Sequence, residues 1–329
     1  MLSKMDDYLI HQTEKPLAEV ASDHPDWQET LYFNMHDRKG EFSALAGLEV
    51  FPNAQYVRAY FFALHKGEHY SYMCAGPLEN WREQIRAGTL SFSVVEPQQA
   101  WRLDLADEAN GIRAAVDFRA RCPVYHYRPI RCEDAGALII NQSYYTQAGV
   151  YRGACTLKDQ VFTDLWGLRA RRWGVLVMPR LPFYHWVSLQ LPTCCITAWQ
   201  FESCEGDMLY CDGAVVTEAG ETTSITGIEH DWTLPPGARH PTRTRLAFST
   251  ATGEILRVEC KEIESHFLGA FPNRWSDADS AALAEADAKA VSTEEYCEFT
   301  LGQERGLGIV DIVSLPGYRR YGIPPLVSV

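Results

Sequence analysis

Side chains capable of acid–base chemistry are concentrated in one stretch of the sequence, residues 144–190. It contains a carboxylate (Asp164), a guanidinium (Arg169) and an imidazole (His185) among several tyrosines and tryptophans. A carboxyl group removed from water has a raised pKa and can donate a proton near neutral pH. Histidine is the side chain whose ordinary pKa lies closest to neutral. We therefore predict Asp164 and His185 as catalytic residues.

Aromatic and polar neighbours of these two residues predict a substrate-binding surface. Aromatic faces stabilise positive charge, and an arginine fork can bind a carboxylate or phenolate through two parallel hydrogen bonds. Strand alternation places Tyr184 and Trp186 on one face and His185 on the other, so either the two aromatic residues or His185 line a pocket. The predicted substrate-binding residues are Trp166, Arg169, Tyr184, Trp186, Tyr145 and Gln147.

Each of these residues also has a structural interpretation. Asp164 could cap a turn or pair with Arg169, and His185 could be a structural residue of a barrel wall with its hydrogen bonds satisfied. The tripeptide Glu229-His230-Asp231 looks like part of a catalytic relay, but adjacent residues of a strand face opposite ways. We therefore assign this tripeptide a structural role.

Composition and charge exclude several classes of protein. The 329 residues are 46% hydrophobic, enough for one large or two medium domains, and the formal net charge is −13. An acidic chain without a basic run is a poor candidate for binding nucleic acid. No apolar run reaches the ~20 residues of a membrane span, and the N-terminal sequence shows no apolar signal core. We expect a cytoplasmic protein whose oligomeric state, including a homodimer, is open.

The sequence predicts neither a metal nor a cofactor. Its ten cysteines are scattered without Cys-x-x-Cys spacing, which is typical of reduced, buried thiols. No clustered His and Cys residues have the spacing of zinc ligands. The sequence also lacks a Gly-x-Gly-x-x-Gly segment, a P-loop and a Gly-x-Ser-x-Gly elbow.

Hydrophobic alternation predicts an all-β fold that could hold such a site. From Trp27 onward, short runs of alternating apolar and polar residues are separated by turn signals, and Asn110-Gly111 is the strongest hairpin signal. We expect a loose N-terminal leader at 1–24, a first β-barrel domain at 25–135 and a second at 136–329. Residues 78–87 are predicted as a helix, 276–293 as a helix or loop, and 316–329 as a tail across the surface.

Four segments in the second half resemble a known family. SYYTQAGVYRG, FTDLWGLR, FYHWVSLQ and TGIEHDWTLPPGARHPTRTRLAFSTATGEILRVEC occur in this order. They resemble the carotenoid 1,2-hydratase and tocopherol cyclase group, and ETLYFNMHD, GLEVFPN and VVEPQQAWRL resemble its first half. The resemblance covers most of the chain and implies two consecutive lipocalin-like (calycin) antiparallel β-barrels.

One position departs from the family pattern. The family has Asp-His-Ser-Trp-Gly, whose His and Trp are linked to activity in the hydratases. This sequence matches the Trp and Gly with Trp166 and Gly167 and keeps Arg169, but has Asp164 in place of the His. The expected function is a cofactor-independent lyase or isomerase (hydratase, dehydratase or cyclase) acting on a terpenoid-, aromatic- or polyketide-like molecule in a barrel pocket. The alternative is a non-catalytic carrier of a hydrophobic ligand.

Overall fold

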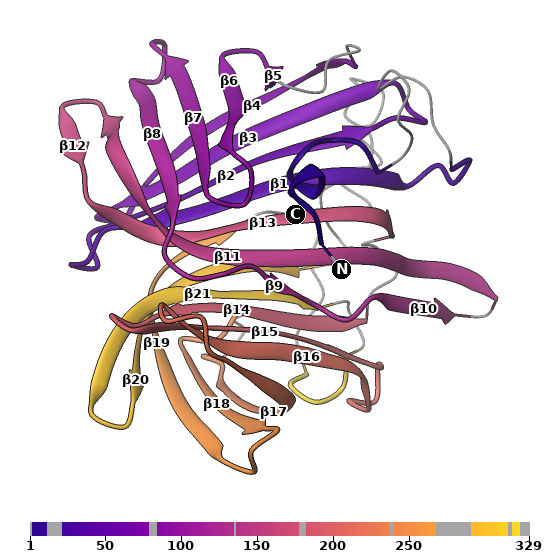
Figure 1. Cartoon of the computed structure of the whole chain (residues 1–329). Coiled ribbons are helices and arrows are strands. Elements are labelled where there is room, and N and C mark those ends of the chain that lie inside the picture. Colours follow the sequence, from indigo (N-terminus) through magenta and orange to yellow (C-terminus); the bar gives the residue numbers. More distant parts are fainter. Residues whose placement is uncertain are drawn as a thin grey trace. The chain divides into compact units, whose positions relative to one another are not determined.

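The computed structural model describes residues 2–11, 22–78, 84–134, 136–177, 182–236, 240–267, 291–314 and 318–322. The chain divides into two compact units, Met1–Leu176 and Val177–Val329. Regular structure in the described residues is almost entirely strand, and the helix among them is a 3-10 turn, η1 (Lys4–Asp7) (Figure 1). The prediction of an all-β fold with two consecutive lipocalin-like barrels is confirmed.

The first unit is a 13-stranded antiparallel sheet. Its strands are β1 (Trp27–His36), β2 (Phe42–Phe51), β3 (Tyr56–His65), β4 (Glu68–Pro77), β5 (Gln84–Ala87), β6 (Leu90–Glu96), β7 (Ala100–Asp107), β8 (Ile112–Ala120), β9 (Tyr125–His126), β10 (Ile130–Asp134), β11 (Ala137–Leu157), β12 (Gln160–Phe162) and β13 (Leu165–Leu176). The main path runs β4-β3-β2-β1-β13-β11-β8-β7-β6-β5, and β9, β10 and β12 pair with β11.

This sheet curls around a hydrophobic core on one face. Alternate residues of each strand point to that face, as Leu31, Phe33 and Met35 of β1 do, and the core also takes side chains from the other strands along the path. The two ends of the path approach each other, because the amide of Thr89, in the turn after β5, donates to the Tyr72 hydroxyl of β4 over 2.8 Å. The first unit is therefore barrel-like.

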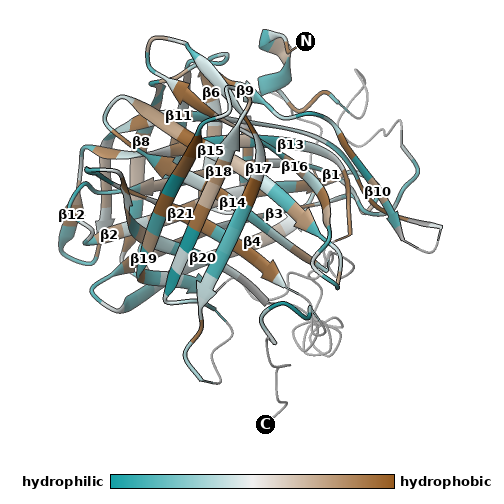
Figure 2. Ribbon diagram, turned by 90° about the horizontal axis from the view of Figure 1, so that it is seen from below, coloured by the Kyte–Doolittle hydropathy of each residue, from teal (hydrophilic) through white to brown (hydrophobic). Residues whose placement is uncertain are grey.

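The second unit is a closed eight-stranded barrel. Its strands are β14 (Phe183–Gln190), β15 (Cys194–Glu202), β16 (Met208–Thr217), β17 (Thr222–Thr233), β18 (Arg243–Thr250), β19 (Ile255–Phe267), β20 (Val291–Leu301) and β21 (Glu304–Ser314). Each pairs with the next in sequence, and β21 returns to β14. This is an up-and-down barrel, in which each strand has a paired neighbour on both sides. In Figure 2, hydrophobic and hydrophilic residues are interspersed along the strands.

A short C-terminal segment covers a gap in the second barrel. β16 pairs with β17 only between Gly213–Val216 and Thr222–Ile225, so the remainder of these two strands lacks mutual hydrogen bonds. The side chains of Arg320 and Tyr321 both donate to the carbonyl oxygen of His230 in β17, at 2.8 and 2.9 Å. In the described part of the tail Tyr318 is buried, whereas Arg319, Arg320 and Gly322 are exposed.

The structure divides the chain later than the expected boundary at 135/136. β11 and β13 belong to the first sheet, where β13 pairs with β1 and β11 pairs with β8. Strands adjacent in sequence can join a sheet at either edge, and alternation does not say which. The expected leader 1–24 also differs, because Asp7 and Leu9 are buried in the first unit.

Two local predictions concern short segments. Residues 84–87 of the predicted helix form β5, paired with β6, so the helical pattern was overridden by the sheet. Residues 276–290 lie outside the described residues, and 291–293 begin β20. Among the described residues, no helix has the length and apolarity to cross a membrane.

Candidate functional site

The predicted site residues are divided between the two units. Five lie in the first unit: Asp164, Trp166, Arg169, Tyr145 and Gln147. Three lie in the second unit: His185, Tyr184 and Trp186.

Asp164 and Trp166 do not have the surroundings that their predicted roles require. Asp164 is exposed at a left-handed turn (φ 55°) directly before β13, so it is not desolvated. The guanidinium groups of Arg38 and Arg121 lie over the Trp166 ring, 4.7 and 4.5 Å from its centroid. The aromatic face predicted to shield a substrate cation thus already contacts cations of the protein itself.

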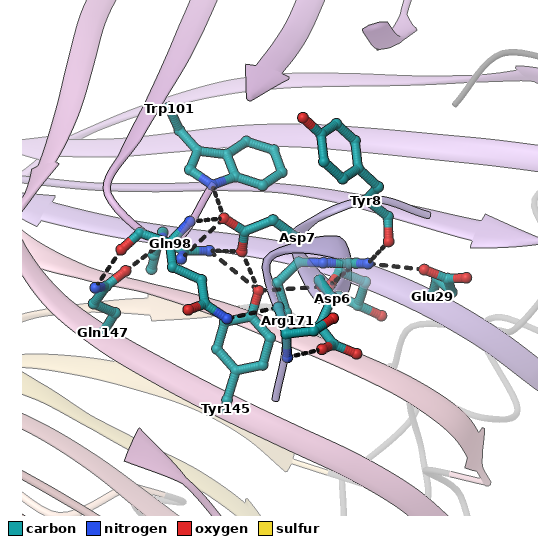
Figure 3. A network of polar contacts seen from close by, with 12 residues as sticks. Asp6, Asp7, Tyr8, Glu29, Gln98, Trp101, Tyr145, Gln147 and Arg171 are labelled. Carbon is teal, nitrogen blue, oxygen red and sulfur yellow. Dashed lines mark hydrogen bonds and ion pairs between the residues drawn. The ribbon is translucent and has the colours of Figure 1, made fainter. Parts of the chain in front are cut away.

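Arg169, Tyr145 and Gln147 do come together, around a carboxylate that the sequence did not indicate. Arg169 of β13 is 1% exposed, and its Nη1 donates to Asp7 Oδ1 over 2.8 Å while Nη2 lies 3.4 Å from Oδ2. The Tyr145 hydroxyl donates to the same Oδ1. Gln147 Oε1 accepts from Arg169 Nε over 3.0 Å. Figure 3 shows Asp7, Tyr145 and Gln147 converging at this point.

Two further donors complete the environment of the Asp7 carboxylate. Trp101 Nε1 lies 3.3 Å from Oδ2, and the backbone amide of Gln98 donates to the same oxygen (Figure 3). Burial by itself would raise the pKa of Asp7, but the charge of Arg169 and these hydrogen bonds outweigh it and lower the pKa. Burial raises the pKa of Tyr145, which stays protonated. The result is an ionised carboxylate in a fully paired, buried setting.

A second ion pair holds the same N-terminal segment. Arg171 Nη2 donates to Glu29 Oε2 and to the Tyr8 carbonyl oxygen, at 2.8 and 2.9 Å (Figure 3). The backbone amide of His11 donates to Glu29 Oε1 over 2.8 Å. The His11 ring stacks on Trp173 with centroids 3.7 Å apart. Arg169 and Arg171 thus both serve to anchor residues 7–11.

His185 lies in a different kind of setting, inside the second barrel. It is 0% exposed, and neither ring nitrogen has a hydrogen-bonding partner among the residues that the structure describes. Phe183 and Val187, on the same face of β14, belong to the barrel core. The His230 ring is 4.7 Å from the His185 ring, centroid to centroid. Burial, with the charge of nearby groups, lowers the pKa of His185 well below its ordinary value, so the ring is neutral.

His230 is held by an ordered set of polar partners. Its Nε2 donates to Glu202 Oε1 over 2.6 Å, and its Nδ1 is 2.9 Å from the Tyr321 hydroxyl. Glu202 also accepts from Tyr318 and from Gln200. Burial lowers the pKa of His230 despite the hydrogen bond with Glu202. Burial would raise the pKa of Glu202, but these hydrogen bonds lower it. A neutral imidazole and an ionised carboxylate therefore form an oriented pair.

Tyr184 and Trp186 lie on the opposite face of β14 from His185, as alternation predicted. The Tyr184 ring packs on Trp199, 5.9 Å away, and its hydroxyl donates to Asp311 over 3.0 Å. His185 instead contacts Phe183 and His230. Of the two arrangements that the sequence allowed, His185 is the residue that faces the barrel interior.

Several other buried polar groups share the end of the barrel where His185 lies. In the strand register, Gln200 of β15 lies opposite His185. On the other side of β14, Ile312 of β21 lies opposite His185, and Thr293 of β20 lies opposite Ile312. Within the described part of the chain, polar atoms without a hydrogen-bonding partner occur on Gln200, Trp232, Thr244, Thr293 and Glu295. Burial, with the charge of nearby acidic groups, raises the pKa of Glu295 well above its ordinary value, which favours the protonated carboxyl. This end of the barrel has polar groups able to bind or protonate a ligand.

A groove outside the barrel has His230 in its lining. It has a volume of about 770 Å³ and lies along β17, β18 and β19, with His230 and Arg320 in its lining. Charged side chains of both signs, such as Asp231 and Arg245, make up much of the remainder. Among the residues that the structure describes, no group of three His, Cys, Asp or Glu side chains is arranged to hold a metal ion.

Sequence reasoning missed Asp7, Glu202 and His230. His230 carried a signal, because Ile228, His230 and Trp232 share one buried face of β17 while Glu229 and Asp231 are exposed. Strand alternation correctly placed His230 on the opposite face of β17 from Glu229 and Asp231. The partner of His230 is Glu202, which comes from β15. Asp7 and Glu202 carried no local signal, since their partners Arg169 and His230 are distant in sequence.

Comparison with known sequences places the protein in a family. A family pattern described as "Family of unknown function (DUF8625)" matches residues 2–323. The chain belongs to this family. A search of curated proteins finds no match. The family shown is therefore one without an assigned activity, and the resemblance to carotenoid hydratases and tocopherol cyclases is a narrower proposal.

Solved structures share the fold at low sequence identity. The ATTH-like protein NE1406 from Nitrosomonas europaea superposes with a TM-score of 0.64 at 14% identity, over 89% of this chain and 92% of its own. CghA with Sch210972 gives a TM-score of 0.61 at 12% identity, over 88% and 89%. A second CghA structure superposes with a TM-score of 0.60 at 13% identity, over 88% of this chain and 89% of its own. At these identities the likeness shows the fold alone.

Proposed function

We propose that this protein is a cofactor-independent lyase or isomerase that performs acid–base chemistry on a hydrophobic small molecule in the second barrel. The observation that carries the proposal is His185, a fully buried imidazole with two unpartnered ring nitrogens beside an oriented histidine–carboxylate pair. A structural histidine in a barrel wall would have its hydrogen bonds satisfied.

His185 is suited to the role of general base. Its lowered pKa keeps the ring neutral, so a ring nitrogen can accept a proton from a substrate carbon or hydroxyl group. The His230–Glu202 pair, fixed by a 2.6 Å hydrogen bond, packs against it and limits how the ring can turn. This replaces the sequence-based expectation that His185 or Asp164 acts as an acid.

Glu295 is the candidate acid. Burial raises its pKa and so favours the protonated form, and its Oε1 has no hydrogen-bonding partner among the described residues. Register places Glu295 opposite Val310, a core residue, so the carboxyl faces the barrel interior as His185 does. Two titratable groups whose pKa values are pushed in opposite directions are the usual sign of an acid and base assignment.

The chemistry that follows is proton removal coupled to elimination, addition or ring closure. In the elimination direction His185 takes a proton from carbon, the C–H electron pair forms a new C=C bond, and Glu295 protonates a departing hydroxyl group as water. The rings of Phe183 and Trp232 pack on His230, and Tyr318 stacks on Phe183, so the surroundings of the two histidines are apolar and aromatic. The ligand in the CghA complex, Sch210972, supports the idea that this fold holds an organic molecule.

The test combines a substrate panel with one substitution. Unsaturated and hydroxylated terpenoid, aromatic and polyketide-like compounds are incubated with the protein in D2O, and mass spectrometry follows deuterium incorporation and product. His185→Gln should lower turnover about 100-fold or more, because a positioned base contributes ~10²–10⁴-fold. His65→Gln, in the first unit, is the matched control and should be active. Turnover unaffected by His185→Gln contradicts the proposal, and ligand binding without any deuterium exchange favours the carrier.

A further inference from the structure

The polar groups around Asp7 are divided unequally between the barrel and the N-terminal segment. All the donors belong to the barrel: Arg169 of β13, Tyr145 of β11, Trp101 of β7 and the amide of Gln98 in the turn before β7. The segment supplies one carboxylate. A set of donors on four elements that converge on a single two-oxygen anion is a carboxylate-binding site in its own right.

The donor geometry fits a carboxylate. Arg169 approaches it with two nitrogens, one to each oxygen, which is the planar fork-to-carboxylate arrangement. Gln147 fixes the guanidinium through Nε, and is itself fixed by donating to the carbonyl oxygens of Gln98 and Cys122. Gln98 has a left-handed backbone (φ 60°), uncommon outside glycine, and its amide donates to the carboxylate.

The surroundings of the site are aromatic and apolar. The guanidinium of Arg169 lies over the rings of Trp101, Phe118 and Tyr145, at 5.6, 5.7 and 5.4 Å from their centroids. Trp101 and Phe118 also contact Phe33 in the core of the first barrel. A carboxylate bound here would have its attached chain next to an apolar interior, so the site suits an amphipathic acid.

The N-terminal segment is held at this site by both apolar and polar contacts. Leu9 belongs to the hydrophobic core, whereas Met5 is 52% exposed. Further attachment comes from Asp7, from the contacts of Arg171 and Glu29 with residues 8 and 11, from the bond of Gln98 Nε2 to the Ser3 carbonyl oxygen, and from the stack of His11 on Trp173. Such a segment can be exchanged for a ligand that offers the same carboxylate and more apolar surface.

We propose that the first barrel binds the carboxylate of an amphipathic organic acid, and that Asp7 occupies this site in cis until the acid displaces it. The barrel then has two states, one with Asp7 on Arg169 and one with a free acid on Arg169. The apparent affinity for the acid is weakened by the fraction of molecules in which Asp7 is bound. This inference does not depend on the reaction proposed for the second barrel.

The first test measures binding of the fluorescent acid 11-(dansylamino)undecanoic acid to the full chain. Asp7→Asn removes the competing charge and should tighten binding about tenfold or more, which is the size of one charged hydrogen bond. Asp159→Asn, at an exposed turn, changes the net charge equally and should leave the affinity within about twofold. The affinity for the methyl ester of the probe should be the same in Asp7→Asn as in the unaltered protein. An equal gain for acid and ester, or no gain for the acid, overturns the proposal.

The second test uses the unaltered protein, in case Asp7→Asn prevents folding. Hydrogen–deuterium exchange of residues 2–11 is followed by mass spectrometry with and without saturating probe. Displacement of Asp7 should speed exchange in this segment, where the amides of Tyr8 and His11 are hydrogen-bonded. Exchange in β18 serves as the internal control. Bound probe with unchanged exchange in 2–11, or no binding of the probe at all, overturns the proposal.

Discussion

The effects of substituting Asp7 and Arg169 on the free energy of unfolding should be strongly coupled. Both side chains are buried, at 0% and 1% exposure, and their closest atoms are 2.8 Å apart. Removing either partner leaves the other charge buried and unpaired, which costs about 3–5 kcal/mol. Replacing both, as Asp7→Asn with Arg169→Met, removes the two charges together. The double variant should therefore be destabilised by much less than the sum of the single variants, with a coupling of at least about 2 kcal/mol.

A double-mutant cycle measures this coupling in the first unit alone. Hydrogen exchange of the β13 amides, followed against urea concentration, reports the free energy of opening that unit. The exposed pair Arg113–Glu108 is the matched control, and its coupling should stay below about 1 kcal/mol. Because the pKa of Asp7 is lowered on folding, the contribution of its carboxylate to the free energy of unfolding is complete at neutral pH and is lost as the pH falls below about 4. A coupling as small as that of the control would refute the reasoning.

Three other predictions concern separate parts of the chain. Burial lowers the pKa of His36 to about 4, so the free energy of unfolding should fall by about 3 kcal/mol between pH 6.5 and 4. His36→Gln should flatten that part of the curve of unfolding free energy against pH, and an unchanged curve would contradict the lowered pKa of His36. Gly153 has φ 108°, and a Cβ added there would lie 2.1 Å from a carbonyl oxygen of β8. Gly153→Ala should lower the free energy of urea unfolding by about 2 kcal/mol or more. Gly220→Ala, where an added Cβ would have no atom within 4 Å, should lower it by about 1 kcal/mol. Tyr318→Phe removes a buried hydrogen bond to Glu202 and should destabilise the second unit by about 1–3 kcal/mol; an unshifted urea midpoint would show that this bond contributes nothing.

The candidate site shows where local patterns stop being informative. Alternation along one strand correctly separated His185 from Tyr184 and Trp186, and Glu229 from His230. Asp164 was selected because a desolvated carboxyl could donate a proton and because it stands where the resembling family has a histidine, but it is exposed at a turn. Whether a carboxyl is desolvated depends on what packs over it. The neighbours of Asp164 in sequence do not provide that cover.

The sequence by itself determined the strand content, most of the turns and which side chains share a face, because these follow from a backbone period of two and from local turn chemistry. It did not determine where β11 and β13 would pair, or that Asp7 would reach Arg169 and Glu202 would reach His230. Those contacts join residues far apart in the chain, and they exist only once each sheet has curled on itself. Tertiary structure therefore decided which polar side chains are buried together, and burial with a chosen partner is what sets their charge and their chemistry.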